Sequence, residues 1–487
     1  MRLPKTDRGC LLALMLVYLL TRLPLLAYLP LVQDEAVYAL MAEEQSHAPG
    51  LIPTFLGYAV SWKPAPVFWV YAGFSRLLSG LLPVEAVYRL PSLLFGLLAL
   101  VPLYFVLRNA GSGASSAFLT LLIFLLSVVS IYPQDAFLTD SLVFLLICTS
   151  LWLYTEKRLP AWRFIAAGAL AFAAFFVKLV IAFMIPFLAV AYFWAYRRET
   201  LRDPLFLASL AAVPLAFLLH YALLSQAGLA GQLFVSDIGG HLVSTDGLLG
   251  QLVFLLGSLY SFILFAGIWF ALSAFGFWKF WRKEPFMAAW YVLSVFPVLS
   301  GFFMPWYFLP VLPAISYFAA AALLRWDGKE KQDAFFFFFL ALAVVLSVIP
   351  IIPTYQSMHS VYAPEKEAGL LLAGRENVLV IGTYAPGIIA YKMLEEQRSL
   401  GRPLDVGWVL FWNNVTRGDV LPYLSDYHVA EPAVVDGSFS SMFTSRSTFR
   451  KDSNITSFDY VAVSGPPMEL PGYGVIYNGT GIAVYAK

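Results

Sequence analysis

The chain has 487 residues, of which 60% are hydrophobic and only 13% are charged, and its mean hydropathy is +0.75. A soluble globular protein carries about 25% charged residues, so this sequence cannot cover a globule with a polar surface. The formal net charge of +1 excludes the strongly basic surface that binds nucleic acid. The two cysteines, Cys10 and Cys148, fit neither a disulfide framework nor a metal-binding motif, and we expect both to be buried.

Apolar blocks suited to helices that cross a bilayer of about 30 Å recur along most of the chain. The first block follows Arg2, Lys5 and Arg8 and continues to about Leu31 without a small-residue cleavage site, so we expect a retained helix rather than a signal peptide. The blocks predict an α-helical polytopic membrane protein with about eleven transmembrane helices. The predicted spans are residues 11–31, 90–107, 115–132, 141–155, 163–177, 180–196, 204–224, 251–273, 286–303, 306–323 and 334–352.

Residues 66–82 form a further apolar block, which is short and is interrupted by Arg76. This pattern predicts an amphipathic helix that lies on the membrane surface. The alternative is a true transmembrane span. The distribution of positive charge distinguishes the two, because cytoplasmic turns carry an excess of lysine and arginine.

Positive residues favour the surface helix and predict the orientation. With a cytoplasmic N-terminus and 66–82 left out of the count, the opposite turns near 133–140, 178, 225–250 and 304–305 carry one lysine and no arginine. Counting 66–82 as a span would move most of the basic clusters to the wrong side. The basic residues of the predicted cytoplasmic turns are Arg108; Lys157, Arg158 and Arg163; Arg197, Arg198 and Arg202; Lys279, Arg282 and Lys283; and Arg325, Lys329 and Lys331.

The tail from about residue 355 is more polar and is expected on the extracytoplasmic side of the cell membrane. It contains the three N-x-[ST] sequons of the chain, at Asn414, Asn454 and Asn478, which agrees with that location and leaves their use open. We expect a transmembrane domain at 1–354, with a first external loop at 32–89, and a soluble domain at 355–487.

Short β-like runs predict that this tail is a small α/β domain. A strand is expected at 377–383, a helix at 386–399 and a second strand in LDVGWVLFW, at 404–412. The closing segment YGVIYNGTGIAVYAK predicts a hairpin with Asn478-Gly479 at its turn.

Titratable side chains from turns far apart in the sequence are predicted to gather at the outer boundary of the membrane. An ionisable group at this depth is costly unless it is paired or hydrated, and for any single residue an interfacial charge that reaches water is a sufficient explanation. A whole set of carboxylates and lysines on one face indicates a functional site instead. The set comprises Asp34, Glu35, Lys63, Asp140, Lys178 and His241.

Such a set has the groups needed for transfer from a lipid-linked phosphate. A carboxylate near a low-dielectric boundary has a raised pKa and can act as a general base toward a hydroxyl. Neighbouring lysines can hold a phosphate and neutralise a leaving group. The aromatic residues of the surface helix, Phe68, Trp69, Tyr71 and Phe74, suit contact with a lipid tail.

At these residues the sequence resembles the GT-C glycosyltransferases, in particular the branch of protein O-mannosyltransferases and lipid A aminoarabinose transferases. The resemblance covers roughly residues 10–325. Ala65 departs from the family pattern, which has proline there, and Val177 and Leu179 replace the usual threonine and glycine around the lysine. The ordered elements that carry the resemblance are Asp34-Glu35, Trp62-Lys63-Pro64-Ala65-Pro66, YRLPSLLFGLL from Tyr88, Thr139-Asp140-Ser141, Lys178, and PWYFLPVLPA at 305–314.

The resemblance implies a GT-C fold and transfer of a hexosyl or pentosyl group from a polyprenyl-phosphate donor, of the dolichyl phosphate type, to an extracytoplasmic hydroxyl with inversion. The implied catalytic residues are Asp34, the general base, with Glu35 and Asp140 supporting it or binding the acceptor. Lys63 and Lys178 would hold the carrier phosphate. The further residues expected to bind substrate are Trp62, Tyr38, Arg89 and His241.

The sequence requires no cofactor. No His/Cys cluster has metal-ligand spacing, but some relatives bind a divalent metal near this cavity. A carboxylate site for such a metal, formed by Asp34 and Asp140, therefore stays open.

Two other functions fit parts of the pattern. A transporter or flippase for a lipid-linked glycan also needs charges in the membrane, but it would more naturally show inverted repeats or broken helices, and we find no internal repeat. A receptor or assembly scaffold would leave the clustered carboxylates unexplained. Glycosyl transfer is therefore the favoured interpretation, with the sugar and the acceptor left open.

Overall fold

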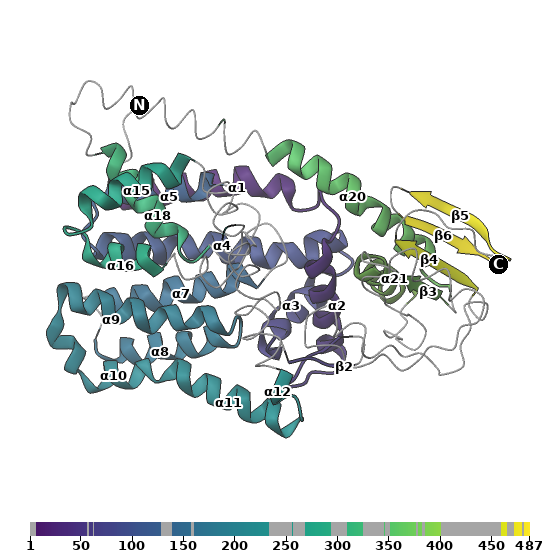
Figure 1. The fold of residues 1–487 in the computed structure, drawn as a ribbon, viewed down its shortest axis with the longest axis horizontal. Helices are drawn as coiled ribbons and strands as arrows, with labels where there is room; N and C mark the ends of the chain where they lie inside the picture. The colour runs from purple at the N-terminus through teal and green to yellow at the C-terminus, as the bar shows by residue number, and fades with distance from the viewer. Residues whose placement is uncertain are drawn as a thin grey trace.

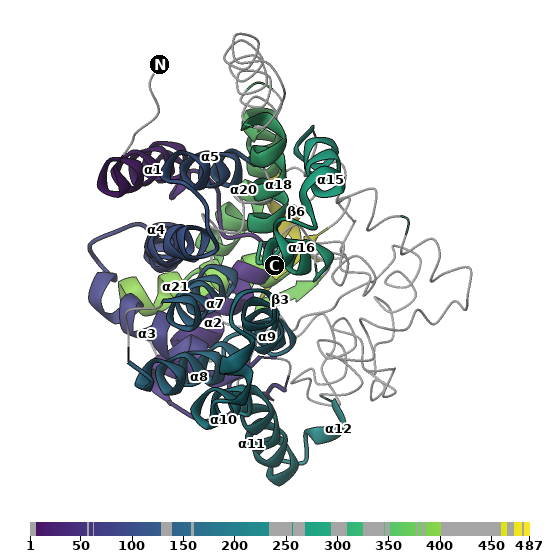
Figure 2. The ribbon, with the colours of Figure 1, turned by 90° about the vertical axis from the view of Figure 1, so that its left-hand side faces the viewer.

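The computed structural model consists mainly of helices, with a small sheet near the C-terminus (Figure 1). Most of the apolar helices run along the long axis, and a view from one end shows them side by side (Figure 2). The structure describes residues 6–55, 58–61, 63–127, 139–156, 160–232, 256, 268–293, 309–324, 345, 351–375, 378–381, 385–400, 459–464, 472–479 and 482–487.

The length and apolar composition of the helices indicate an integral membrane protein. Among the described residues, three stretches, Asp7–Leu25, Val84–Asn109 and Pro204–Gln226, are long and apolar enough to cross a membrane, by length and composition. The number of spans and their orientation stay predictions. The apolar helices are α1 (Asp7–Arg22), α4 (Val84–Asn109), α5 (Ala114–Leu126), α7 (Asp140–Thr155), α8 (Trp162–Phe175), α9 (Met184–Tyr196), α10 (Pro204–Leu210), α11 (Ala212–Gln226), α15 (Ile268–Phe280), α16 (Pro285–Leu293) and α18 (Leu312–Leu324).

Shorter helical turns join or extend these helices. A 3-10 turn directly follows α1, and another leads into α9, so each of these helices continues the apolar block that the sequence shows. The short elements are η1 (Leu23–Leu25), η2 (Val180–Phe183), η3 (Arg198–Arg202) and α12 (Ala230–Gln232).

Buried hydrogen bonds join α1 to its neighbours in the body. The Tyr18 hydroxyl donates to the Leu93 carbonyl of α4 at 2.9 Å. Arg22, which is fully buried, donates from Nη2 to the Leu125 carbonyl of α5 at 3.0 Å. Both contacts satisfy polar groups that would otherwise be costly in an apolar interior.

The segment predicted as the first external loop includes the helices α2 (Gln33–His47) and α3 (Ala65–Leu78), with the short strands β1 (Thr54–Phe55) and β2 (Tyr58–Ala59) between them. The 14 residues of α3 reach about 21 Å, which is too short to cross a bilayer of about 30 Å. One side of α3 is buried, whereas large apolar side chains on the other side are exposed: Trp69, Val70 and Leu77. These two faces agree with the predicted amphipathic helix.

The described part of the tail contains a mixed four-stranded sheet in the order β3-β4-β6-β5, in which β3 and β4 are parallel and the other pairs antiparallel. The predicted strand at 377–383 and the predicted helix at 386–399 match β3 and α21. The elements of the tail are α20 (Ile351–Leu372), β3 (Val378–Ile381), α21 (Ala385–Leu400), β4 (Tyr460–Ser464), β5 (Gly474–Gly479) and β6 (Ile482–Ala486).

The closing hairpin is confirmed, but its turn was placed wrongly. Asn478 and Gly479 pair with Ala483 and Ile482 as the last residues of β5, because the strand pairing includes both of them. Asn478 is exposed, whereas the other two sequons and the strand predicted at 404–412 lie outside the described residues.

Helices α15 and α18 approach each other closely where α15 has a glycine. A Cβ atom added at Gly276 would lie 2.0 Å from the Phe318 carbonyl oxygen and 3.4 Å from the Ala322 Cβ. Small residues allow close approach of helices in membranes, where packing rather than hydrophobicity drives association.

Gly276→Ala is therefore expected to push α15 and α18 apart and to lower stability by about 1–3 kcal/mol. Gly73→Ala is the matched control, because a Cβ at Gly73 in α3 meets no atom within 4 Å. Alanine there should be neutral or stabilising by about 0.5–1 kcal/mol. Thermal unfolding of the purified protein in detergent measures both, and equal stability of the two variants would contradict the packing argument.

Candidate active site

A buried ion pair joins Arg89 of α4 to Glu35 of α2, at the start of the loop helices. Arg89 Nε donates to Glu35 Oε1 at 2.8 Å, and Nη2 donates to Oε2 at 2.6 Å. The side chains are 3% and 2% exposed. Glu35 Oε2 also accepts from the backbone N–H of Val32, at 2.9 Å, so the pair joins the first turn of α2 to α4.

The rest of the Arg89 guanidinium binds the chain that leads into α2. It donates to the carbonyls of Leu26, Leu29 and Pro30, at 3.4, 2.6 and 2.7 Å. A guanidinium has five N–H donors, and these contacts together with Glu35 use them all. These contacts hold the loop against α4, and the expected role of Arg89 in binding substrate stays a prediction.

Asp34 precedes Glu35 on α2 but has a different environment. Its side chain is partly exposed, and among the described residues no hydrogen bond or ion pair joins it to a partner. Loss of hydration in this buried setting raises the pKa of the Asp34 carboxyl, and the positive charges of Lys63 and Lys178 partly oppose that rise. The carboxylate is thus a stronger base than a solvated aspartate, with two ammonium groups nearby.

Asp140 and Lys178 form a second buried ion pair. Asp140 is the first residue of α7, and Lys178 lies in the turn between α8 and η2. Nζ and Oδ1 are 2.5 Å apart, and the lysine and aspartate side chains are 8% and 2% exposed. Burial lowers the pKa of Lys178 to about 8, although the neighbouring Asp140 opposes this shift.

Lys63 and Tyr38 complete the group around Asp34. The ammonium of Lys63 lies 5.8 Å from the centre of the Tyr38 ring, a cation–π arrangement. Tyr38 is one helical turn after Asp34 on α2 and packs against Phe68 of α3, with ring centres 5.9 Å apart. The loop helices therefore hold Lys63 close enough to act on both Asp34 and Lys178.

Of the residues expected from the sequence, the structure brings together Asp34, Lys63, Asp140 and Lys178, with Tyr38 beside them. The roles of these residues stay proposals. Trp62 and His241 lie outside the part of the chain that the structure describes.

The tail contacts this region through Tyr391 of α21. The Tyr391 hydroxyl accepts from the backbone N–H of Leu31 at 2.6 Å and donates to Glu85 of α4 at 2.8 Å. Lys366 of α20 binds the same Glu85 oxygen at 2.7 Å. A side chain of the tail is thus hydrogen-bonded three residues before Asp34, so the tail helps to hold the loop.

Sequence reasoning missed His220, on α11. Its ring hydrogen-bonds to the backbone of Ser61, two residues before Lys63, and its Nε2 is buried without a hydrogen-bond partner among the described residues. An ionisable residue within an apolar block is itself a signal of function, and the sequence LLHYA contains that signal.

The described residues around Asp34 do not fit a divalent metal ion. In the described ranges no three His, Cys, Asp or Glu side chains are grouped so that they could hold one. The two carboxylates considered, Asp34 and Asp140, share their surroundings with two ammonium groups, and Lys178 binds Asp140 directly. A dication placed there would be repelled by both.

No protein-family model matches the sequence, and no curated protein matches it in a sequence comparison. Solved structures, in contrast, match this chain in fold. The structure of ArnT from Cupriavidus metallidurans bound to undecaprenyl phosphate matches 98% of this chain and 97% of that chain, with a TM-score of 0.58 and 17% identity. The apo state of the same protein gives a TM-score of 0.60 and 18% identity over the same shares.

The oligosaccharyltransferase of Archaeoglobus fulgidus in its apo form is similar over 79% of this chain and 64% of that chain, with a TM-score of 0.50 and 12% identity. Both neighbours are glycosyltransferases of the GT-C fold. This chain has the same fold, which confirms the fold expected from the resemblance in sequence.

Replacing Arg89 by methionine is expected to destabilise the protein by about 3–5 kcal/mol, because Glu35 is left as a buried charge without its partner. The control is Arg108→Met, since the pair of Arg108 with Asp7 is 33% and 43% exposed and 3.1 Å long. An exposed pair is worth about 0–1 kcal/mol. Thermal unfolding in detergent compares the two; similar losses would show that Arg89 holds no special position.

Proposed function

We propose that the protein is a membrane glycosyltransferase that transfers a sugar from a polyprenyl-phosphate donor to a hydroxyl group on the extracytoplasmic side. The proposal rests on one observation, the group of Asp34, Lys63, Asp140 and Lys178 at one end of a GT-C fold. Transfer from a lipid phosphate needs a base for the hydroxyl and cations for the leaving phosphate, and this group contains both. ArnT, which has the same fold, is bound to undecaprenyl phosphate.

The proposed reaction is a single displacement with inversion. Asp34 takes the proton of the acceptor hydroxyl as its oxygen attacks the anomeric carbon of the sugar. The bond between that carbon and the phosphate oxygen breaks on the opposite side. The polyprenyl phosphate leaves with the electron pair of the broken bond, and Lys63 and Lys178 neutralise its added charge.

The other site residues position these groups. Asp140 holds the ammonium of Lys178 in place. Glu35 and Arg89 fix the first turn of α2, so that Asp34 projects beside the lysines. In this proposal residues 1–354 form the catalytic membrane domain, with about eleven spans, and residues 355–487 lie outside the cytoplasm.

Asp34→Asn is expected to lower the transfer rate about 10²–10⁴-fold, because the amide cannot accept the proton. The assay follows release of free polyprenyl phosphate from a polyprenyl-phosphate sugar in the presence of acceptor. Asp203→Asn is the matched control: Asp203 caps the N-terminus of α10, and asparagine caps equally well.

Normal release by the Asp34 variant would show that this carboxylate is not the base. A flippase would give a different result with both the wild-type protein and the Asp34 variant. It would release no carrier phosphate with either protein but would move the lipid across the bilayer of sealed vesicles.

The transfer rate should depend on pH in a bell shape. Asp34 must be deprotonated, so the rate falls as pH drops through its raised pKa. Lys178 must be protonated, so the rate also falls as pH rises through about 8. Lys178→Arg, which stays charged at all these pH values, should move only the alkaline limb upward; an unchanged alkaline limb would exclude Lys178 as its cause.

A further inference from the structure

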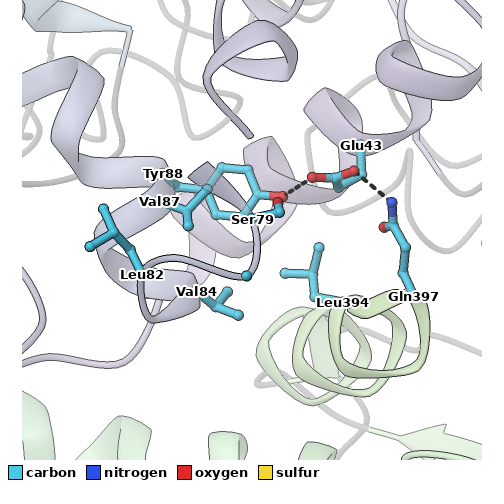
Figure 3. Close-up of a pocket in the computed structure, with 9 residues that line it drawn as sticks. Glu43, Ser79, Leu82, Val84, Val87, Tyr88, Leu394 and Gln397 are labelled. Carbon is cyan, nitrogen blue, oxygen red and sulfur yellow. Dashed lines mark hydrogen bonds between the residues drawn. The ribbon is translucent and has the colours of Figure 1, made fainter. Parts of the chain in front are cut away.

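A separate cavity of about 280 Å³ lies between the first external loop and the tail. Its walls come from α2, from the turn between α3 and α4, from the start of α4 and from α21 (Figure 3). Its apolar lining includes Leu82, Val87 and Leu394, and its polar lining includes Glu43 and Gln397. None of these residues belongs to the group around Asp34.

Glu43 is the acidic residue that lines this cavity. The residue is 5% exposed. One oxygen accepts from the hydroxyls of Ser75 and Tyr88, and the other accepts from Gln397 Nε2, at 2.9 Å, and from the Ser46 hydroxyl, at 3.3 Å. All four donors are neutral, so none of them brings a positive charge to Glu43.

Three other acids of this junction have cations. Glu35 is paired with Arg89, Glu85 with Lys366, and Glu396 with Lys392. Among the described side chains no lysine or arginine nitrogen lies within 4 Å of Glu43. A buried charge is stable when a charge of opposite sign accompanies it, and here the space for one is the cavity.

Glu365 of α20 provides the contrast. It too is buried and has no partner among the described residues. Its carboxyl packs directly over Gly387, where an added Cβ would lie 1.8 Å from Oε2, and burial raises its pKa to about 9. Glu365 is therefore closed in and neutral at pH 7, whereas Glu43 borders an open volume.

The remaining polar groups of the cavity offer acceptors for a cation that has several N–H donors. Gln397 Nε2 is 2.8 Å from His47 Nε2 as well as bonded to Glu43. Because both contacts use the amide N–H groups, the Gln397 carbonyl oxygen stays an acceptor. The Ser79 hydroxyl also lines the cavity. The aliphatic walls leave room for one compact group, about the size of a single sugar ring.

We infer that this cavity binds a protonated primary amine carried by the acceptor, with the ammonium group beside Glu43. The inference rests on the proposed glycosyl transfer only in assigning the amine to the acceptor. Glu43 follows Asp34 by nine residues on α2, about 13 Å along the helix axis. One acceptor molecule can span that distance, with its amine in the cavity and its hydroxyl at Asp34.

The test compares two probes of equal size, glucosamine and glucose, binding to the full-length protein in lipid nanodiscs at pH 7, measured by saturation-transfer NMR. Glucosamine is expected to bind about tenfold or more tightly than glucose, and Glu43→Gln should make the two equal. Equal binding to the wild-type protein, no binding of glucosamine, or an unchanged preference in the variant would each overturn the inference.

A second variant guards against misfolding of the first. Gln397→Lys places an ammonium beside Glu43, so it should abolish glucosamine binding while keeping or raising thermal stability. Persistent glucosamine binding in a folded Gln397→Lys protein would also overturn the inference. Asp34→Asn separates this inference from the proposed function, because it should abolish transfer while leaving the preference for glucosamine intact.

Discussion

The five N–H groups of Arg89 hold the chain between Leu26 and Glu35 against α4, and the position of Asp34 depends on that hold. Successive residues of a helix point about 100° apart. When Glu35 turns toward the guanidinium, Asp34 is therefore directed elsewhere, toward Lys63 and Lys178. The two neighbouring carboxyl groups thus lie in different surroundings: Glu35 is paired with Arg89, whereas Asp34 has a raised pKa beside two lysines.

The same segment is also held from the tail. Tyr391 binds the backbone of Leu31 and the carboxylate of Glu85, which Lys366 neutralises. Helices α20 and α21 therefore take part in shaping the loop that carries Asp34, although they are more than 300 residues away in sequence. The cavity at Glu43 follows from this docking, since α21 closes one of its walls.

Sequence reasoning could predict the grouping of Asp34, Lys63, Asp140 and Lys178, because topology places the turns between successive helices on common faces of the membrane. It could not predict that all the N–H groups of Arg89 would donate hydrogen bonds to Glu35 and to three backbone carbonyls. That contact joins residues 54 apart through a buried geometry without any periodic pattern.

The cavity at Glu43 could not be predicted from the sequence either, because Gln397, in its wall on α21, follows Glu43 by 354 residues. In the tail, strand and helix followed from local patterns, whereas the hairpin turn was misplaced because the pairing with β6 includes an Asn-Gly dipeptide that usually marks a turn. A structure of the Asp34→Asn variant with a polyprenyl-phosphate sugar bound would test the proposed donor site. We expect its phosphate oxygens about 3 Å from the ammonium nitrogens of Lys63 and Lys178, with the anomeric carbon facing residue 34. A phosphate that touches neither lysine, or a donor bound at the opposite end of the helices, would contradict it.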